Sequence, residues 1–247
     1  MGFIEKTLFL LKNAKVLGKR GATYYKKGQI EKAIECFTLA IQLEPDWAYA
    51  YAWRGFLYGE KESYKEAISN LTRSIELETD YEYAYTKRGE IYFTAGKFEK
   101  ALIDYDEAIR INPDNSGHYL NYGYILAHQE RFEDAISAYN QSLLIAPNAD
   151  TYHDRGLAKL NSENKESAMD DFIQAIEINP DYANAYFSMG VLLSDLKRYN
   201  EAEEAYRKVV EINPKIFQAY YNLGLLLHEE LERYDEAEKA YRKAVKI

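Results

Sequence analysis

A glycine recurs along this chain at a nearly constant spacing, and that spacing constrains the fold more than any other feature. Successive members of the series lie 34, 34, 34, 33, 34 and 34 residues apart: Gly21, Gly55, Gly89, Gly123, Gly156, Gly190 and Gly224. Each of the first six is followed by an alanine after twelve residues and by a large apolar residue after sixteen; after the last, both come one residue later. A period of this length is typical of a repeat array in which each unit stacks on its neighbours.

The apolar residues of one unit predict two amphipathic helices. In the third unit Tyr85, Gly89 and Tyr92 follow helical spacing, and a second helical block begins at Ala101. Between the blocks Gly96 suits the left-handed conformation that ends a helix. A glycine inside a helix costs about 1 kcal/mol relative to alanine. We therefore expect Gly89 to let the two helices approach closely, so that burial of large side chains offsets that cost.

The pattern of an aromatic residue, then Gly, Tyr, Ala, an aromatic residue, Ala and Pro over 34 residues resembles the tetratricopeptide repeat (TPR) family. The resemblance covers almost the whole chain and implies an all-α fold, a TPR helix-turn-helix solenoid that forms a right-handed superhelix. Residues 1–13 resemble a capping helix or the remnant of a preceding repeat. The expected seven units are about 14–47, 48–81, 82–115, 116–148, 149–182, 183–216 and 217–247.

Charge and cysteine content exclude several classes of partner and site. The net charge of -9 disfavours nucleic acid and anionic membrane surfaces, whose phosphates need clustered Lys and Arg. No apolar segment approaches the roughly 20 residues that span a bilayer, so no membrane insertion is expected. The single cysteine, Cys36, permits no internal disulfide and agrees with a reducing compartment, so we expect a cytoplasmic protein.

The sequence contains no pattern typical of an enzyme. It lacks the glycine-rich phosphate loops, and its four histidines show no zinc-binding spacing such as H-x-x-x-H. The acidic pairs on second helices point in different directions and favour a solvated surface. We therefore expect no catalytic residue, no metal and no cofactor.

The TPR resemblance implies a concave groove lined mainly by the first helix of each pair. In the family, side chains six and three residues before the repeat glycine, and one, four and five after it, project into this groove. Asparagines two residues before the glycine hold a peptide backbone in some members. The predicted binding residues are Tyr49, Phe56, Glu60, Tyr83, Glu90, Phe93, Leu120, Asn121, Tyr124, His128, Leu157, Phe187, Val191, Asp195, Tyr221, Asn222, Leu225 and Glu229.

Most of these residues are aromatic, apolar or acidic, so the resemblance implies a protein-binding scaffold or adaptor. Its partner would be a protein or peptide with apolar and basic residues. The family subtype that clamps chaperone carboxylates needs Lys, Asn, Asn, Lys and Arg; here those places hold Gly18, Ala22, Trp53, Tyr83 and Lys87. Two alternatives remain: a substrate-targeting TPR module of a larger enzyme such as a glycosyltransferase, or a self-assembling structural repeat protein. Self-association would use the uncapped C-terminal repeat.

Overall fold

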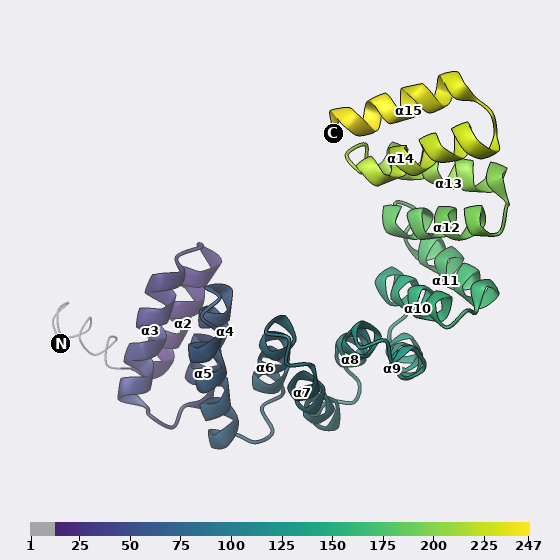
Figure 1. Ribbon diagram of the computed structural model, residues 1–247. Helices are drawn as coiled ribbons and strands as arrows, with labels where there is room; N and C mark the ends of the chain where they lie inside the picture. The colour runs from purple at the N-terminus through teal and green to yellow at the C-terminus, as the bar shows by residue number, and fades with distance from the viewer. Residues whose placement is uncertain (1–12) are drawn as a thin grey trace. The chain divides into compact units, whose positions relative to one another are not determined.

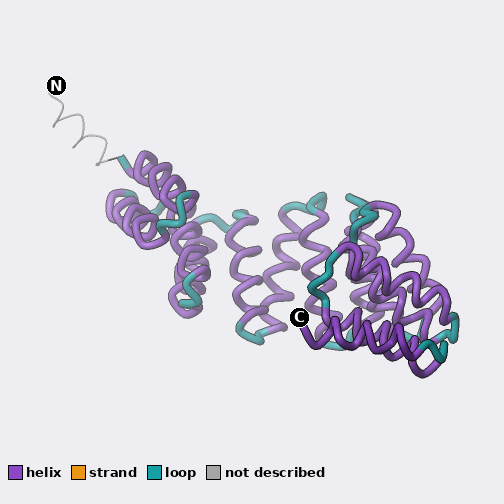
Figure 2. The backbone as a smooth tube through the Cα atoms, turned by 90° about the horizontal axis from the view of Figure 1, so that it is seen from above, coloured by secondary structure: helices purple, strands orange, loops and turns teal. Residues whose placement is uncertain are grey.

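The structure, a computed structural model, describes residues 13–247, and every regular element among them is a helix (Figure 2). The chain divides into two compact units, residues 1–125 and 126–247. The predicted capping helix or repeat remnant, residues 1–13, lies outside the described part except for its last residue. Asn13 is described, and its side chain caps α2 by accepting a hydrogen bond from the Val16 N–H at 3.2 Å.

The first unit is built from helix pairs joined by short turns, as Figure 1 shows. Each first helix packs on the second helix of its own pair, and successive pairs stack through α3 on α4 and α5 on α6. Its helices are α2 (Ala14–Lys26), α3 (Ile30–Leu43), α4 (Ala48–Glu60), α5 (Tyr64–Leu77), α6 (Glu82–Thr94), α7 (Phe98–Ile111) and most of α8 (Ser116–His128).

The second unit begins within α8 and repeats the same design. Pairs α10 with α11, α12 with α13, and α14 with α15 stack in chain order, and α9 packs on α10. Its helices are α9 (Phe132–Ile145), α10 (Ala149–Asn161), α11 (Lys165–Ile178), α12 (Ala183–Asp195), α13 (Tyr199–Ile212), α14 (Phe217–Leu225), η1 (Leu226–Glu230) and α15 (Tyr234–Lys246). The predicted all-α helix-turn-helix solenoid is confirmed.

The repeat glycines lie where an aromatic or aliphatic side chain of the paired helix needs room. A Cβ added at Gly89 would lie 3.0 Å from the ring of Tyr105, and one at Gly156 would lie 2.7 Å from the ring of Phe172. Both rings are almost completely buried. The alanine twelve residues after each of the first six repeat glycines, such as Ala101, is also fully buried. Close helix packing is therefore the reason for the glycine period.

Each turn between a first and a second helix contains one residue with left-handed backbone. Two of them are glycines, Gly28 at φ 71° and Gly96 at φ 69°, the latter as predicted. The Lys97 N–H donates to the Tyr92 carbonyl at 2.8 Å, which closes a Schellman-type C-cap. The other five turns place a charged residue at this position: Glu62, Glu130, Glu163, Lys197 and Glu232.

The first helix of the last repeat ends in a π-helical segment, η1, which accommodates one extra residue. Its closing bond runs from the Arg233 N–H to the Leu227 carbonyl at 2.7 Å, six residues back instead of the five seen in earlier turns. This insertion explains why Ala237 follows Gly224 by thirteen residues. Packing is preserved, because a Cβ at Gly224 would still lie 2.7 Å from the Tyr241 ring.

An arginine just before the glycine bridges second helices in three repeats. Arg88 donates from Nε and Nη2 to both Asp104 carboxylate oxygens, at 2.8 and 2.7 Å, and from Nη1 to the Thr72 hydroxyl at 2.9 Å. Asp104 is 2% exposed. We call such a set a polar bridge. The three bridges are Arg54 with Thr38 and Asn70, Arg88 with Thr72 and Asp104, and Arg155 with Asn140 and Asp171.

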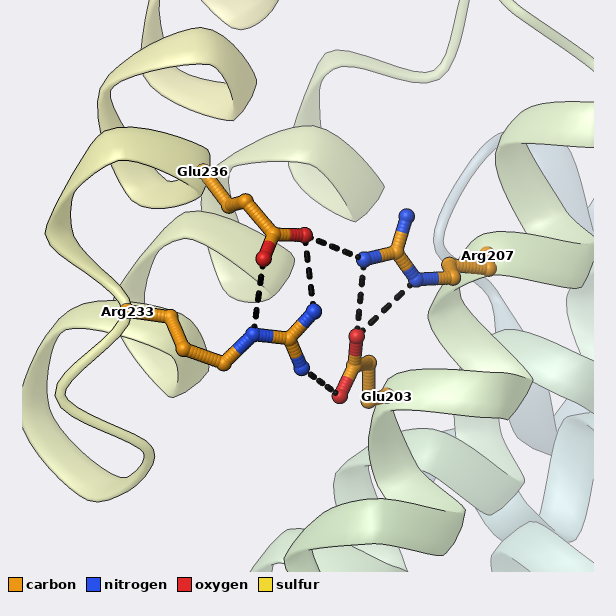
Figure 3. Close-up of polar contacts among 4 residues, drawn as sticks. All are labelled: Glu203, Arg207, Arg233 and Glu236. Atoms are coloured by element: carbon orange, nitrogen blue, oxygen red, sulfur yellow. Dashed lines mark hydrogen bonds and ion pairs between the residues drawn. The ribbon is translucent and has the colours of Figure 1, made fainter.

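A ring of four alternating charges joins the last two repeats (Figure 3). Arg233 pairs with Glu203 at 2.6 Å and with Glu236 at 2.7 Å, and Arg207 contacts the same carboxylates at 2.7 and 3.0 Å. The hydrogen bond from Arg233 lowers the pKa of Glu236. The ring therefore fixes α15 against α13 without placing an unpaired charge between them.

Candidate functional site

Four aromatic side chains from three successive first helices meet in the first unit. Tyr25 comes from α2, Trp53 and Phe56 from α4, and Tyr83 from α6. The Trp53 ring centroid lies 5.9 Å from that of Tyr25 and 5.8 Å from that of Phe56. It also stacks on Tyr83 at 6.2 Å. All four side chains are half-buried, so part of each ring remains accessible. We call these four residues the aromatic cluster.

The hydrophobic core holds the aromatic cluster in place. Trp53 stacks on the buried Phe37 ring, with centroids 5.7 Å apart and an interplanar angle of 12°. Phe37 in turn occupies the space left by Gly21. The predicted binding residue Tyr49 stacks on Trp47 at 5.3 Å and lies 6.1 Å from Trp53. A rigid aromatic surface of this kind loses little conformational entropy when it binds a partner.

Lys87 places an ammonium group against this cluster. Its Nζ lies 5.5 Å from the Phe56 centroid and 5.8 Å from the Tyr83 centroid, within the range of cation–π attraction. The same Nζ donates to both carboxylate oxygens of Glu90, at 2.9 and 2.8 Å. Burial raises the pKa of Tyr83, so this phenol is neutral at physiological pH. The cluster and Glu90 thus already form a favourable environment for a cation.

A recess of about 290 Å³ adjoins this lysine, between α4 and α6. Glu60 and Glu62 lie at its edge and form no ion pair within residues 13–247, whereas Glu90 is neutralised by Lys87. The recess therefore carries excess negative charge beside aromatic surface. Its lining consists of Phe56, Gly59, Glu60, Glu62, Tyr64, Lys87, Glu90, Ile91 and Thr94.

A smaller aromatic group lies farther along the first unit. The ring centroid of Phe93 on α6 lies 5.4 Å from that of Tyr124 on α8 and 5.6 Å from that of Phe98. Tyr124 is 48% exposed. The other predicted residues of α8 are Leu120, which is half-buried, and His128, which is exposed. These side chains are accessible, but they do not extend the aromatic cluster.

The two predicted peptide-holding asparagines contact tyrosines. The Asn121 side chain lies close to the Tyr105 phenol, and the Asn222 side chain lies close to the Tyr206 phenol. Burial raises the pKa of both phenols. Each tyrosine stands sixteen residues before its asparagine, on the preceding second helix. These contacts give both amides a role in stacking the repeats, and their role in holding a peptide stays a prediction.

In the second unit the predicted aromatic residues form pairs. Phe187 lies 6.0 Å from the Tyr206 ring, and Tyr221, which is 48% exposed, lies 6.0 Å from the Tyr241 ring. Val191 packs with Phe187 against the core of the last two repeats. The structure therefore does not bring these side chains into one continuous aromatic surface.

The remaining predicted residues of the second unit differ in exposure. Leu157 packs against the core around Phe172, and Leu225 is half-buried at the end of α14. Asp195 and Glu229 are exposed, and the Asp195 carboxylate lies 3.7 Å from Lys165 Nζ. These acids can supply charge at the surface, but they do not surround an aromatic recess as Glu60 and Glu62 do.

Of the aromatic cluster and its lysine, three residues are absent from the predicted set: Tyr25, Trp53 and Lys87. Trp53 and Lys87 both stand two residues before a repeat glycine, the position shared by Asn121 and Asn222. Both would have been identified if the residue two before the glycine had been counted as a binding residue in every repeat, and not only where it is asparagine. Tyr25 stands four residues after Gly21, at one of the positions expected to face the groove, but it is not among the predicted binding residues.

Within the part of the chain that the structure describes, no group of three or more His, Cys, Asp or Glu side chains could hold a metal ion. Burial raises the pKa of the Cys36 thiol, which makes the thiolate scarce. His118 is buried against Glu82, with Nε2 2.6 Å from Oε1, and His153 contacts the Ser188 hydroxyl at 3.0 Å. Among the helices of residues 13–247, none is both long and apolar enough to cross a membrane.

Sequence profiles of one repeat family match most of the chain. Profiles described as "Tetratricopeptide repeat" match residues 48–81, 82–115, 104–137, 149–182, 183–216 and 205–239. A profile described as "TPR repeat" matches residues 21–61. No curated protein matches the chain significantly.

Solved structures share the architecture. The MamA protein is 28% identical, with 67% of this chain and 90% of that chain covered and a TM-score of 0.60. YrrB, described as a TPR protein with an unusual peptide-binding site, is 21% identical. The match covers 76% of this chain and 98% of YrrB, with a TM-score of 0.63. A TPR protein from Cytophaga hutchinsonii is 16% identical, with 92% and 98% covered and a TM-score of 0.77. The last two likenesses, at under 25% identity, show the fold alone.

Proposed function

The chain belongs to the tetratricopeptide repeat family, and from that premise we propose that it binds a protein or peptide segment on the first-helix face of its first unit. The TPR fold is a protein-interaction scaffold and a non-catalytic module. We propose a ligand segment with apolar and basic residues, whose apolar side chains contact the aromatic cluster. A lysine or arginine of that segment would lie near Glu60 and Glu62. The acidic surroundings disfavour the carboxylate-clamp mode.

One observation carries this proposal. Lys87 already holds an ammonium group against Phe56, Tyr83 and Glu90. The same surroundings continue into the recess beside it, where two further carboxylates have no cationic partner within residues 13–247. Electrostatic attraction between such carboxylates and a cation is stronger next to a partly desolvated aromatic wall than in water.

Selection from a random-peptide library tests the proposal. Peptides with aromatic or aliphatic residues next to Lys or Arg should be enriched. Their affinity should fall at least about tenfold with Tyr83→Ala, because buried aromatic residues dominate interface energetics. Glu60→Lys with Glu62→Lys should weaken the same peptides. Tyr234→Ala, which removes a 58% exposed tyrosine of the second unit, is the matched control. Enrichment of acidic peptides, or equal binding by the Tyr83 variant, would contradict the proposal.

A second candidate, self-association, is favoured by the outer face of α15. Tyr234 and Val245 are 58% and 87% exposed and border an apolar recess of about 440 Å³. Apolar surface of this kind favours contact with another helix, including one from a second copy of the chain. A mass that rises with concentration in light scattering, and returns to monomer with Val245→Glu, would support it. The remaining alternative, a targeting module of a larger enzyme, is compatible with peptide binding at the aromatic cluster of the first unit.

A further inference from the structure

A recess of about 600 Å³ opens in the second unit, and most of its lining residues come from second helices. It lies between the second helices α11 and α13, with α12 beneath it. Met189 and Leu193 from α12 and Met169 from α11 form its apolar floor. Ile173 on α11 is 41% exposed there. The volume lies within the roughly 300–1,000 Å³ typical of ligand sites.

This recess lies where other repeats place a polar bridge. The positions that carry arginine and its two partners in the bridges are here occupied by Met189, Ile173 and Ala205. All three polar members have thus been replaced by apolar ones at a single bridge, which here spans the fifth and sixth repeats. A comparable recess of about 430 Å³ on the second repeat keeps its polar lining, including Arg54. Of the three apolar residues, Ala205 is buried, Met189 is half-buried and Ile173 is exposed. Since a polar bridge satisfies its own side chains, its replacement by apolar residues that leave Ile173 exposed needs another physical reason.

The charges at the edge of the recess are almost all neutralised within the chain. Arg198 pairs with Glu201 at 2.6 Å, and Lys208 pairs with Glu211 at 2.7 Å. Arg207 belongs to the ring of four charges described above. Glu204 is exposed and forms no ion pair with any residue between 13 and 247. The charge available to a partner is therefore a single carboxylate.

The lining on α13 extends from Glu201 to Glu211. At 1.5 Å per residue this is about 15 Å, or nearly three helical turns. Methionine-lined apolar floors adapt to varied side chains. We propose that this recess binds an amphipathic helix of a partner protein, with a bulky apolar residue on the floor and a Lys or Arg paired with Glu204. This site lies in the second unit, shares no residue with the proposed peptide site and does not depend on it.

A library of amphipathic helical peptides, with acidic and basic members equally represented, tests the proposal. The matched control restores the chain's own polar bridge with Ile173→Thr, Met189→Arg and Ala205→Asp. Helices selected by the wild type over this variant should carry an aromatic or long aliphatic residue next to Lys or Arg. Replacing that apolar residue by Ala should weaken binding about 30-fold. Glu204→Lys, an exposed change that leaves the floor intact, should weaken it about threefold to tenfold.

Circular dichroism and thermal unfolding verify that both variants fold. If the triple variant does not fold, Glu204→Lys alone decides, because only a helix seated at this recess loses affinity through that charge. Three results would overturn the proposal: no helix preferred by the wild type, selected helices that are acidic, or basic helices whose binding is unchanged by Glu204→Lys. Helices lost with Tyr83→Ala instead would belong to the aromatic cluster and would also count against this site.

Discussion

Gly55 and Leu71 are so close that a Cβ on the glycine would lie 2.7 Å from Cγ of the leucine. The same Cβ would lie 3.1 Å from the backbone oxygen of Ala67. At Gly89 the nearest atoms belong to the Tyr105 ring, at 3.0 Å, and the nearest backbone oxygen is 3.5 Å away. The two positions are equivalent in the repeat, yet only one faces a backbone that cannot move aside.

This difference predicts that replacing each glycine by alanine changes the free energy of unfolding by different amounts. Gly55→Ala should lower the free energy of unfolding by about 1–3 kcal/mol, because overpacking exceeds the gain in helix propensity. Gly89→Ala should change it by less than about 1 kcal/mol, because the gain of about 1 kcal/mol offsets a small ring displacement. Urea unfolding of both variants measures this. Equal losses at the two positions would show that local backbone contact does not set the cost.

The polar bridge at Arg88 predicts a pH-dependent defect. Arg88→Met leaves the Asp104 carboxylate buried and unpaired, so the free energy of unfolding should fall by about 3 kcal/mol at neutral pH. Arg88→Met with Asp104→Ala, which copies the apolar residues of the sixth repeat, should recover most of this loss. Urea unfolding of the two variants and the wild type makes the comparison. A double variant as unstable as the single one would mean that the bridge itself, not the unpaired acid, determines stability.

The sign of the pH effect follows from Asp104. Burial raises its pKa, although the hydrogen bonds and charge of Arg88 oppose that shift. An acid with a raised folded-state pKa holds its proton more tightly when folded. Its stabilising contribution is therefore present below the unfolded pKa, ordinarily 3.8, and is lost as pH rises through the folded pKa. The defect of Arg88→Met relative to the wild type should accordingly shrink as the pH falls below the folded pKa. A constant difference across pH would contradict this reasoning.

The sequence predicts the helix pairs well because the glycine, the alanine and the large apolar residue are positions of direct contact, such as Gly89 with Tyr105. It predicts the aromatic cluster only in part. Phe56 and Tyr83 were expected, whereas the stacking of Trp53 on Tyr83 and the position of Lys87 over Phe56 and Tyr83 depend on how neighbouring first helices stack. The π-helical segment appears in the sequence only as a one-residue delay before Ala237. Spacing reveals that an insertion exists, but not where the helix absorbs it.

The left-handed turn residues predict opposite changes in stability when glutamate and glycine are exchanged at equivalent turn positions of two repeats. Glu163 has φ 62°, a conformation that costs a side-chain-bearing residue roughly 1–2 kcal/mol and glycine almost nothing. Glu163→Gly should therefore raise the free energy of unfolding by roughly 1 kcal/mol, and Gly96→Glu should lower it by a similar amount. The matched control is Glu166→Gly, in the first turn of α11, which should destabilise. Thermal unfolding distinguishes these cases, and destabilisation by Glu163→Gly would refute the backbone argument.

The π-helical segment predicts that one deletion is tolerated. Glu229 and Glu230 are adjacent, exposed and identical, so removing either gives the same chain, in which the alanine follows Gly224 by twelve residues. The shortened segment can close as an ordinary α-helical turn, with the packing of Tyr241 on Gly224 retained. The melting temperature should stay within a few degrees of the wild type, since a change of about 1 kcal/mol shifts it by only that much. Deleting the exposed Asn161 at the end of α10, where no extra residue exists, should lower it clearly more. Similar losses from both deletions would mean that the inserted residue is required for the fold of the last repeat.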